Sequence, residues 1–211
     1  MARTAMDLIL GTVSKDHQLA RKQGVLVFPA STWLVGEGPD ADAKQISKWL
    51  ELSEKAKTNR QVNNMHKFTG DIAMTTAEVK ELIQRSWPFV REFYKLFDYK
   101  DPYLYAGFMI KYAGGKDSHL DLHTDDCLFT INICLQSSVS GTDIVFEKWG
   151  VGGTKYCSVE MKSGDFLFHL GDHAHQTSHL RSGERTNLVL WINAHKIKDV
   201  EEKLELKDRD I

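Results

Sequence analysis

The first hundred residues carry apolar side chains at helical spacing. One face of the segment 41–56 holds four of them: Ala43, Ile46, Trp49 and Leu50. Positions three and four apart lie on the same side of a helix, so these residues form one apolar stripe. Asp40 is a suitable cap in front of it. We therefore expect an amphipathic helix over 41–56 that buries this stripe.

A second helix is predicted by the capping box Thr75-x-x-Glu78, in which each residue can bond the backbone N–H of the other. Its apolar face then begins with Val79, Leu82 and Ile83. Pro88 leaves two alternatives open, since it either kinks this helix or starts a new one. The new helix would carry its own stripe: Val90, Tyr94 and Phe97.

Beyond Asp101-Pro102 the pattern changes to short β-prone runs separated by glycine turns. The expected strands cover 104–112, 129–135, 143–146, 157–161, 165–169 and 186–192. An earlier apolar segment covers 25–28. Many short strands with the helices collected upstream predict an α+β fold: a double-stranded β-helix (jelly roll) core with N-terminal helices packed on one face.

The length of 211 residues suits a single domain, 1–211. Within it we expect a mainly helical scaffold over 1–100, the jelly-roll core over 104–193 and a charged helix or tail over 198–211. The three cysteines, Cys127, Cys134 and Cys157, are odd in number and partly embedded in apolar strand, which favours reduced, packed thiols.

Charge and hydropathy exclude some classes of partner. Lys and Arg number 27 against 29 Asp and Glu, a net charge of −2, so the whole chain has no general attraction for nucleic acid or anionic membrane. The N-terminus has only a short apolar run, too short for a signal peptide core or a membrane span. We expect a soluble, cytoplasmic protein with no membrane partner.

Metal-capable side chains crowd the start of the strand 129–135, in the stretch HLDLHTDDCLFTINICL. His123-x-Asp125 can hold one face of a divalent metal, and His119-x-Asp121 competes with it. Neither motif is specific alone. A second histidine-rich strand region, GDFLFHLGDHAHQTSHLRSGERTNLVLW, follows at 164–191 and can bring a third ligand across a jelly roll. Two histidines and one carboxylate leave open positions on an octahedral iron.

These segments resemble the Fe(II)- and 2-oxoglutarate-dependent oxygenases, in the branch of the prolyl and lysyl hydroxylase catalytic domains. LDLHTDDCLFTINICL is similar to the lysyl hydroxylase pattern L-x-x-H-x-D-x-x-x-F-T-I-N-I-x-L, and FMIKY precedes it as in that family. HAHQTSHLRSGERTNLVLW resembles the family's H-x-H followed by G-x-R and an apolar strand. The resemblance covers about residues 105–193, and we recognise none in residues 1–100.

The family's spacing assigns the residues. Its Thr lies seven positions after the first metal histidine, which fits Thr130 with His123 and not with His119. Its cosubstrate arginine lies ten after the distal histidine, which pairs Arg185 with His175. The resemblance thus implies iron ligands His123, Asp125 and His175. The six other histidines and acids nearby become turn, surface or supporting groups: His119, Asp121, Asp126, His169, His173 and His179.

Strand alternation agrees with a cosubstrate pocket on one face, with Thr130 and Asn132 beside Arg185. The resemblance implies that Arg185 clamps the distal carboxylate of 2-oxoglutarate. Many prolyl hydroxylase relatives carry Tyr where this chain has Cys134, so Tyr105 or Tyr112 is left to supply that hydrogen bond. The implied cofactors are Fe(II), 2-oxoglutarate as cosubstrate and O2, with ascorbate as an optional accessory.

The resemblance implies a hydroxylase that releases succinate and CO2, since halogenating relatives have a small residue in place of Asp125. We favour a C–H bond of a protein or amino-acid side chain, of lysyl or prolyl type, and leave other metabolites open. A nucleic-acid substrate is disfavoured because position 191 is Trp where demethylating relatives have a second arginine. The alternatives are a non-catalytic jelly roll that binds metal and 2-oxoglutarate, or senses it, and a zinc hydrolase, which Arg185 fits poorly.

Overall fold

The computed structural model describes residues 18–34, 41–55, 60–62, 65–68, 74–114, 118–138, 143–147 and 157–198. The helical elements are α2 (Gln18–Lys22), the 3-10 turn η2 (Ala30–Thr32), α3 (Ala41–Lys55) and α4 (Thr76–Phe93). The strands before the metal-capable stretch are β1 (Leu26–Pro29), β2 (Arg60–Val62), β3 (Met65–Phe68) and β4 (Tyr99–Ala113). The remaining strands are β5 (Leu120–His123), β6 (Phe129–Ser137), β7 (Asp143–Phe146), β8 (Cys157–Glu160), β9 (Asp165–Leu170), β10 (His175–Thr177) and β11 (Glu184–Lys196).

The strands form two antiparallel sheets. The larger has seven strands in the order β1-β9-β6-β11-β4-β3-β2, and the smaller has four in the order β5-β10-β7-β8. Neighbours in these sheets are far apart in sequence: β6 lies between β9 and β11, and β10 lies between β5 and β7. Two facing antiparallel sheets with such crossovers are the architecture of a jelly roll, as the sequence predicts.

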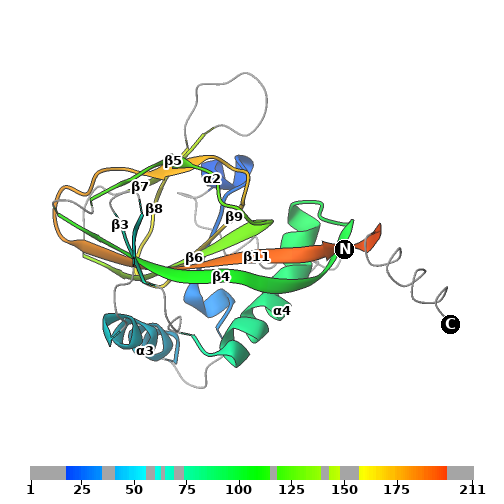
Figure 1. Ribbon diagram of the computed structural model, residues 1–211, viewed down its shortest axis with the longest axis horizontal. Helices are drawn as coiled ribbons and strands as arrows, with labels where there is room; N and C mark the ends of the chain where they lie inside the picture. Colours follow the sequence, from blue (N-terminus) through cyan, green and yellow to red (C-terminus); the bar gives the residue numbers. More distant parts are fainter. Residues whose placement is uncertain are drawn as a thin grey trace.

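Helices α3 and α4 cover one side of the large sheet, and the small sheet lies on its other side (Figure 1). Alternation along β6 explains both contacts. Ile131 and Ile133 pack in the main core with Trp49 of α3 and Leu82 of α4. Cys134, on the opposite face of β6, instead joins a cluster with the apolar side chains of β7 and β8. Helices α3 and α4 therefore lie on one face of the sheet, as expected, and leave its other face for the site, whereas Ala20 of α2 packs with the cluster on that other face.

Helix α4 confirms the predicted capping box. Thr75 Oγ1 accepts a hydrogen bond from the Glu78 N–H at 3.2 Å, and Glu78 Oε2 accepts one from the Thr75 N–H at 2.6 Å. The helix runs through Pro88 to Phe93, so the alternative of a new helix after Pro88 is wrong. Phe97 accordingly lies past the helix end, 46% exposed, with the Arg91 guanidinium over its ring.

The six predicted strands are all present, and several extend further than the apolar pattern indicates. The strand predicted over 104–112 spans Tyr99–Ala113, and that predicted over 186–192 spans Glu184–Lys196. The paired ends of β4 and β11 hold each other through backbone hydrogen bonds that side-chain pattern does not reveal. Most of the predicted tail 198–211 lies outside the described residues, and the division of the chain into parts stays a prediction.

Two smaller expectations are also answered. Cys127, Cys134 and Cys157 are all free thiols. Within the described residues, no helix combines the length and the apolar composition that crossing a bilayer requires.

Candidate metal and cosubstrate site

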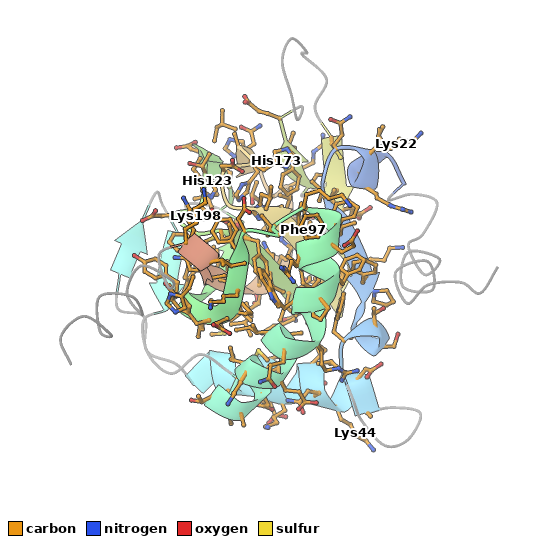
Figure 2. The ribbon with its side chains drawn as sticks, turned by 90° about the vertical axis from the view of Figure 1, so that its right-hand side faces the viewer. Lys22, Lys44, Phe97, His123, His173 and Lys198 are labelled. Carbon is orange, nitrogen blue, oxygen red and sulfur yellow. The ribbon has the colours of Figure 1, made fainter. Side chains whose placement is uncertain are left out.

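The small sheet brings together two histidines, His123 and His175, that lie far apart in the sequence. His123 ends β5 and His175 begins β10, and the two are direct partners in the antiparallel ladder between these strands. Their ring centroids are 4.3 Å apart. Figure 2 shows His123 in the part of the molecule away from α3, which carries Lys44. The pairing of β5 with β10 therefore places the two imidazoles close enough to bind one metal ion together.

Asp125 comes from the loop that follows β5, and the turn after β9 holds this loop in place. The Asp125 N–H donates to the Gly171 carbonyl at 2.8 Å, and the Gly171 N–H donates to the Leu128 carbonyl at 3.1 Å. A Cβ atom on residue 171 would collide with the backbone of Cys127. Glycine is needed here because of this close backbone approach.

The three predicted ligands form a group that could hold a metal ion, with their ligand atoms all within 4.8 Å of one another. His123 Nε2 lies 3.6 Å from Asp125 Oδ1, and His175 Nε2 lies 4.0 Å from Asp125 Oδ2. Asp125 and His175 are each 8% exposed. The sequence therefore singles out the residues that the fold brings together.

Backbone carbonyls orient both imidazoles for metal binding. His123 Nδ1 is 2.7 Å from the Asp121 carbonyl oxygen, and His175 Nδ1 is 3.0 Å from the His173 carbonyl oxygen. A carbonyl only accepts, so Nδ1 carries the hydrogen in each ring, and it is Nε2 that faces the Asp125 carboxylate. Burial, reinforced by the neighbouring His169, lowers the pKa of His175 to about 3. A neutral imidazole with a free Nε2 is the form that a metal requires.

Thr130 has a different contact from the expected one. Its hydroxyl donates to Asp125 Oδ2 at 2.5 Å, and Cys127 Sγ lies 3.3 Å from the same hydroxyl. Thr130 lines the cavity, as a cosubstrate residue would, but the partner of its hydroxyl is the carboxylate of a candidate ligand. Such a bond fixes the orientation of the carboxylate.

A cavity of about 240 Å³ opens onto these residues. Part of its wall is apolar: Phe108, Ile110, Leu120, Ile144, Val189 and Trp191. Most of these side chains form a cluster separate from the main core, with Trp191 meeting Phe108 edge to face at 5.1 Å. Tyr112 lines the cavity, whereas Tyr105 is 52% exposed and is not among the lining residues. Tyr112 is thus the better placed of the two tyrosines.

Arg185 is fully buried at the start of β11, next to Tyr112 of β4 in the ladder. Its guanidinium lies 4.6 Å from the centroid of the Tyr112 ring. Arg185 itself is not among the residues that line the cavity, but Tyr112 and Thr177 are, and their hydroxyls are 3.0 Å apart. Two hydroxyls backed by a buried cation form a polar end to the cavity that suits a carboxylate.

Asn132 also lines the cavity, and its side-chain oxygen accepts a hydrogen bond from the Asn187 amide at 2.8 Å. Cys134, on the same face of β6, is buried, and burial raises the pKa of its thiol to about 12 although Arg185 acts in the opposite sense. A thiol that stays protonated has the packing role that the sequence suggests.

His169 is the residue whose place the sequence analysis underestimates. It is 1% exposed, it lines the cavity, and its Nε2 lies 3.6 Å from Asp125 Oδ2. Alternation along the strand after Asp165 could have found it, since His169 shares a face with Leu167, which points toward the small sheet. Thr177 was likewise not anticipated.

The other nearby histidines and acids lie off the cavity wall. Asp121 and Asp126 are exposed. His119 and His179 face each other with ring centroids 3.9 Å apart, and His179 lies beside the Ser118 hydroxyl. His173 is buried with its Nε2 on the Glu147 carbonyl at 2.8 Å. None of them belongs to the group of ligand atoms at the site.

Solved structures define the class of fold. A 2OG-Fe(II) oxygenase family oxidoreductase from Burkholderia pseudomallei superposes with a TM-score of 0.62 at 15% identity, over 92% of this chain and 93% of that one. A Pseudomonas putida prolyl-4-hydroxylase gives 0.60 at 14% identity, over 89% of this chain and 100% of that one. HygX from Streptomyces hygroscopicus, solved with nickel, 2-oxoglutarate and hygromycin B, gives 0.58 at 14% identity, over 86% and 87%. The chain has the jelly-roll fold of the 2-oxoglutarate–Fe(II) oxygenases.

Sequence comparison points to the same group. The chain is 31% identical over 98 residues to a protein named 2-oxoglutarate and iron-dependent oxygenase domain-containing protein 2 from Xenopus tropicalis, and 31% identical over 103 residues to the human protein of that name. Each match covers 45% of this chain and 28% of the relative, so the chain spans less than a third of the curated relatives it matches. No family model matches. In fold, and over this partial match in sequence, the chain is similar to proteins named as 2-oxoglutarate and iron-dependent oxygenases.

Proposed function

We propose that this chain is an Fe(II)- and 2-oxoglutarate-dependent dioxygenase that hydroxylates a C–H bond, with release of succinate and CO2. The observation that carries the proposal is the convergence of His123, Asp125 and His175 on a cavity. Two imidazole nitrogens and one carboxylate on one side of an ion leave room for other ligands. Bound Fe(II), together with 2-oxoglutarate and O2, would supply the oxidising chemistry.

The chain's own residues would position the reactants. Carbonyl oxygens of the backbone hold the two imidazoles in the metal-binding tautomer, and Thr130 holds Asp125. The hydroxyls of Tyr112 and Thr177, with Arg185 behind Tyr112, would bind the distal carboxylate of 2-oxoglutarate. Asn132 would lie along the same molecule, and the apolar wall would exclude water.

For the primary substrate we propose an uncharged side chain, with a prolyl residue of a peptide favoured over a lysyl one. The described part of the cavity wall is rich in apolar groups, and Asp125 is the single acidic residue in it. A lysyl ammonium would lose its hydration there without a second carboxylate as partner. Among the neighbours, the Pseudomonas putida protein is named a prolyl-4-hydroxylase.

The central test is conversion of 2-oxoglutarate to succinate under air with Fe(II), with and without ascorbate. The wild-type protein should produce succinate, and His123→Ala and His175→Ala should not. Peptides that differ only in carrying Pro, Leu or Lys at one position, examined by mass spectrometry for the gain of one oxygen, test the substrate class. Oxidation of the Lys peptide alone would refute the preference for an uncharged side chain.

Arg185→Ala separates cosubstrate binding from metal binding. The variant should bind 2-oxoglutarate at least about tenfold more weakly, because the buried cation behind Tyr112 is lost, while Mn(II) affinity changes little. Binding of both ligands by the wild-type protein, with no succinate from any peptide or from a cell extract, would instead favour a sensor or binding module.

A further inference from the structure

Three imidazoles surround Asp125, although the proposed ligand set uses two of them. His169 Nε2 is 3.6 Å from Asp125 Oδ2, as close as His123 Nε2 is to Asp125 Oδ1. His169 nevertheless lies outside the group of atoms that could share one metal ion. His169 is therefore buried and directed at a candidate metal ligand, but it is not placed to bind the metal itself. This arrangement suggests that another molecule lies between His169 and Asp125.

The environment of His169 fixes the direction and the tautomer of its ring. The ring lies between two aromatic neighbours, with its centroid 4.5 Å from that of His175 and 5.2 Å from that of Phe146. Nδ1 is 2.8 Å from the Leu170 carbonyl oxygen, so Nδ1 carries the hydrogen. In this tautomer the lone pair of the neutral ring is on Nε2, the nitrogen that faces Asp125.

The two atoms that face each other are therefore both acceptors. Asp125 Oδ2 already receives the Thr130 hydroxyl, and a carboxylate oxygen has a second lone pair to offer. An imidazole lone pair and a carboxylate oxygen cannot bond each other directly, and a bridging molecule with two O–H donors satisfies both. The cavity borders both side chains and gives such a molecule access.

We propose that His169 Nε2 and Asp125 Oδ2 together hold a water molecule of the metal site, which makes His169 a positioning residue. The inference rests on the proposed function, because it places this water beside a metal held by His123, Asp125 and His175. The proposal also predicts which end of the cavity binds the carboxylate of the cosubstrate. A carboxylate of the cosubstrate offers acceptors alone and is disfavoured next to two more acceptors, so it is directed to the end of the cavity with Tyr112 and Thr177.

The first experiment is a crystal structure of the protein loaded with Mn(II). We expect an ordered water within about 3.2 Å of both His169 Nε2 and Asp125 Oδ2, and no bond from His169 to the metal. A His169 Nε2 atom bound to the ion would overturn the proposal in favour of a fourth protein ligand. A dry gap between the two acceptors would overturn it as well.

The second experiment compares His169→Phe with His173→Phe. Both rings pack against Phe146, but His173 is not on the cavity wall. Oxygen-17 relaxation of solvent water in the presence of Mn(II)-loaded protein measures how fast water at the ion exchanges. Exchange should be about threefold to tenfold faster in His169→Phe, as loss of one hydrogen bond predicts, and unchanged in His173→Phe.

Metal affinity distinguishes the remaining outcomes. Mn(II) should bind His169→Phe within about threefold of wild type, since His169 Nε2 is 3.6 Å from Asp125 Oδ2, too far for a direct hydrogen bond to that ligand. Unchanged water exchange with intact Mn(II) binding would show that His169 only fills space. Failure of the wild-type protein to bind Mn(II) at all would refute the proposed function itself, which is a different result.

Discussion

The hydroxyl of Thr130 provides a direct test of how the candidate metal site is organised. Replacing Thr130 by Val keeps the shape and β-branching of the side chain and removes the hydrogen bond to Asp125 Oδ2. That bond is 2.5 Å long, lies in a buried part of the protein and joins a hydroxyl to a carboxylate. Hydrogen bonds to charged groups contribute about 1.5–3 kcal/mol, and loss of such support around a metal ligand weakens binding by about 10–100-fold.

We expect Thr130→Val to bind Mn(II) or Co(II) about 10–100-fold more weakly in anaerobic titrations followed by calorimetry. Thr130→Ser retains the hydroxyl and should bind either metal within a few-fold of wild type. The affinity for 2-oxoglutarate, measured at saturating metal, should change less than the affinity for the metal.

The opposite result has a clear meaning. Suppose that Thr130→Val leaves the metal affinity unchanged and strongly weakens the binding of 2-oxoglutarate. This result would show that Thr130 serves the cosubstrate, as the family resemblance implies. The hydrogen bond to Asp125 would then have no bearing on metal binding.

Three further predictions concern stability. Gly171→Ala should lower the free energy of unfolding by about 1–3 kcal/mol, because its methyl group meets the Cys127 backbone, whereas Gly114→Ala, which meets nothing within 4 Å, should be close to neutral in the same urea titration. Burial tends to raise the pKa of Glu78, but its hydrogen bonds from Thr75 and Lys48 lower it from 4.5 to about 2. Its contribution, about 1–2 kcal/mol after allowance for partial exposure, should be present above pH 4.5, fall away as the pH drops toward 2, and be missing in Glu78→Gln. Mn(II) at a hundred times its dissociation constant should stabilise the wild-type protein by about 2.7 kcal/mol and leave His175→Ala unaffected, and equal stabilisation of both would place the ion elsewhere.

Local pattern predicts much of this fold because it reports on local physics. The capping box at Thr75 and the apolar stripe that contains Trp49 each describe one helix, and both helices form. The sequence pattern fails to predict strands that form only by pairing with segments distant in the sequence. Strands β5 and β10 are short and polar, and they become strands because each completes the hydrogen bonds of the other.

The candidate site also has a part that the sequence predicts and a part that it does not. The spacing within the family motif predicts His123, Asp125 and His175 as ligands, and the fold brings the ligand atoms of these three residues together. The contacts that Thr130 and His169 make with Asp125 depend on how strands β6 and β9 lie against the loop after β5. A one-dimensional pattern carries no record of such neighbours.

The candidate site is built from both sheets. Both imidazoles and Thr177 come from the four-stranded sheet, whereas Arg185, Tyr112 and Asn132 come from the seven-stranded one. The spacing between the parts of the site on the two sheets is therefore set by the layer of side chains, Phe146 among them, that lies between the sheets. Trimming that layer should misalign the two reactants while each half of the site still binds its own ligand, so that turnover fails at temperatures where the protein remains folded.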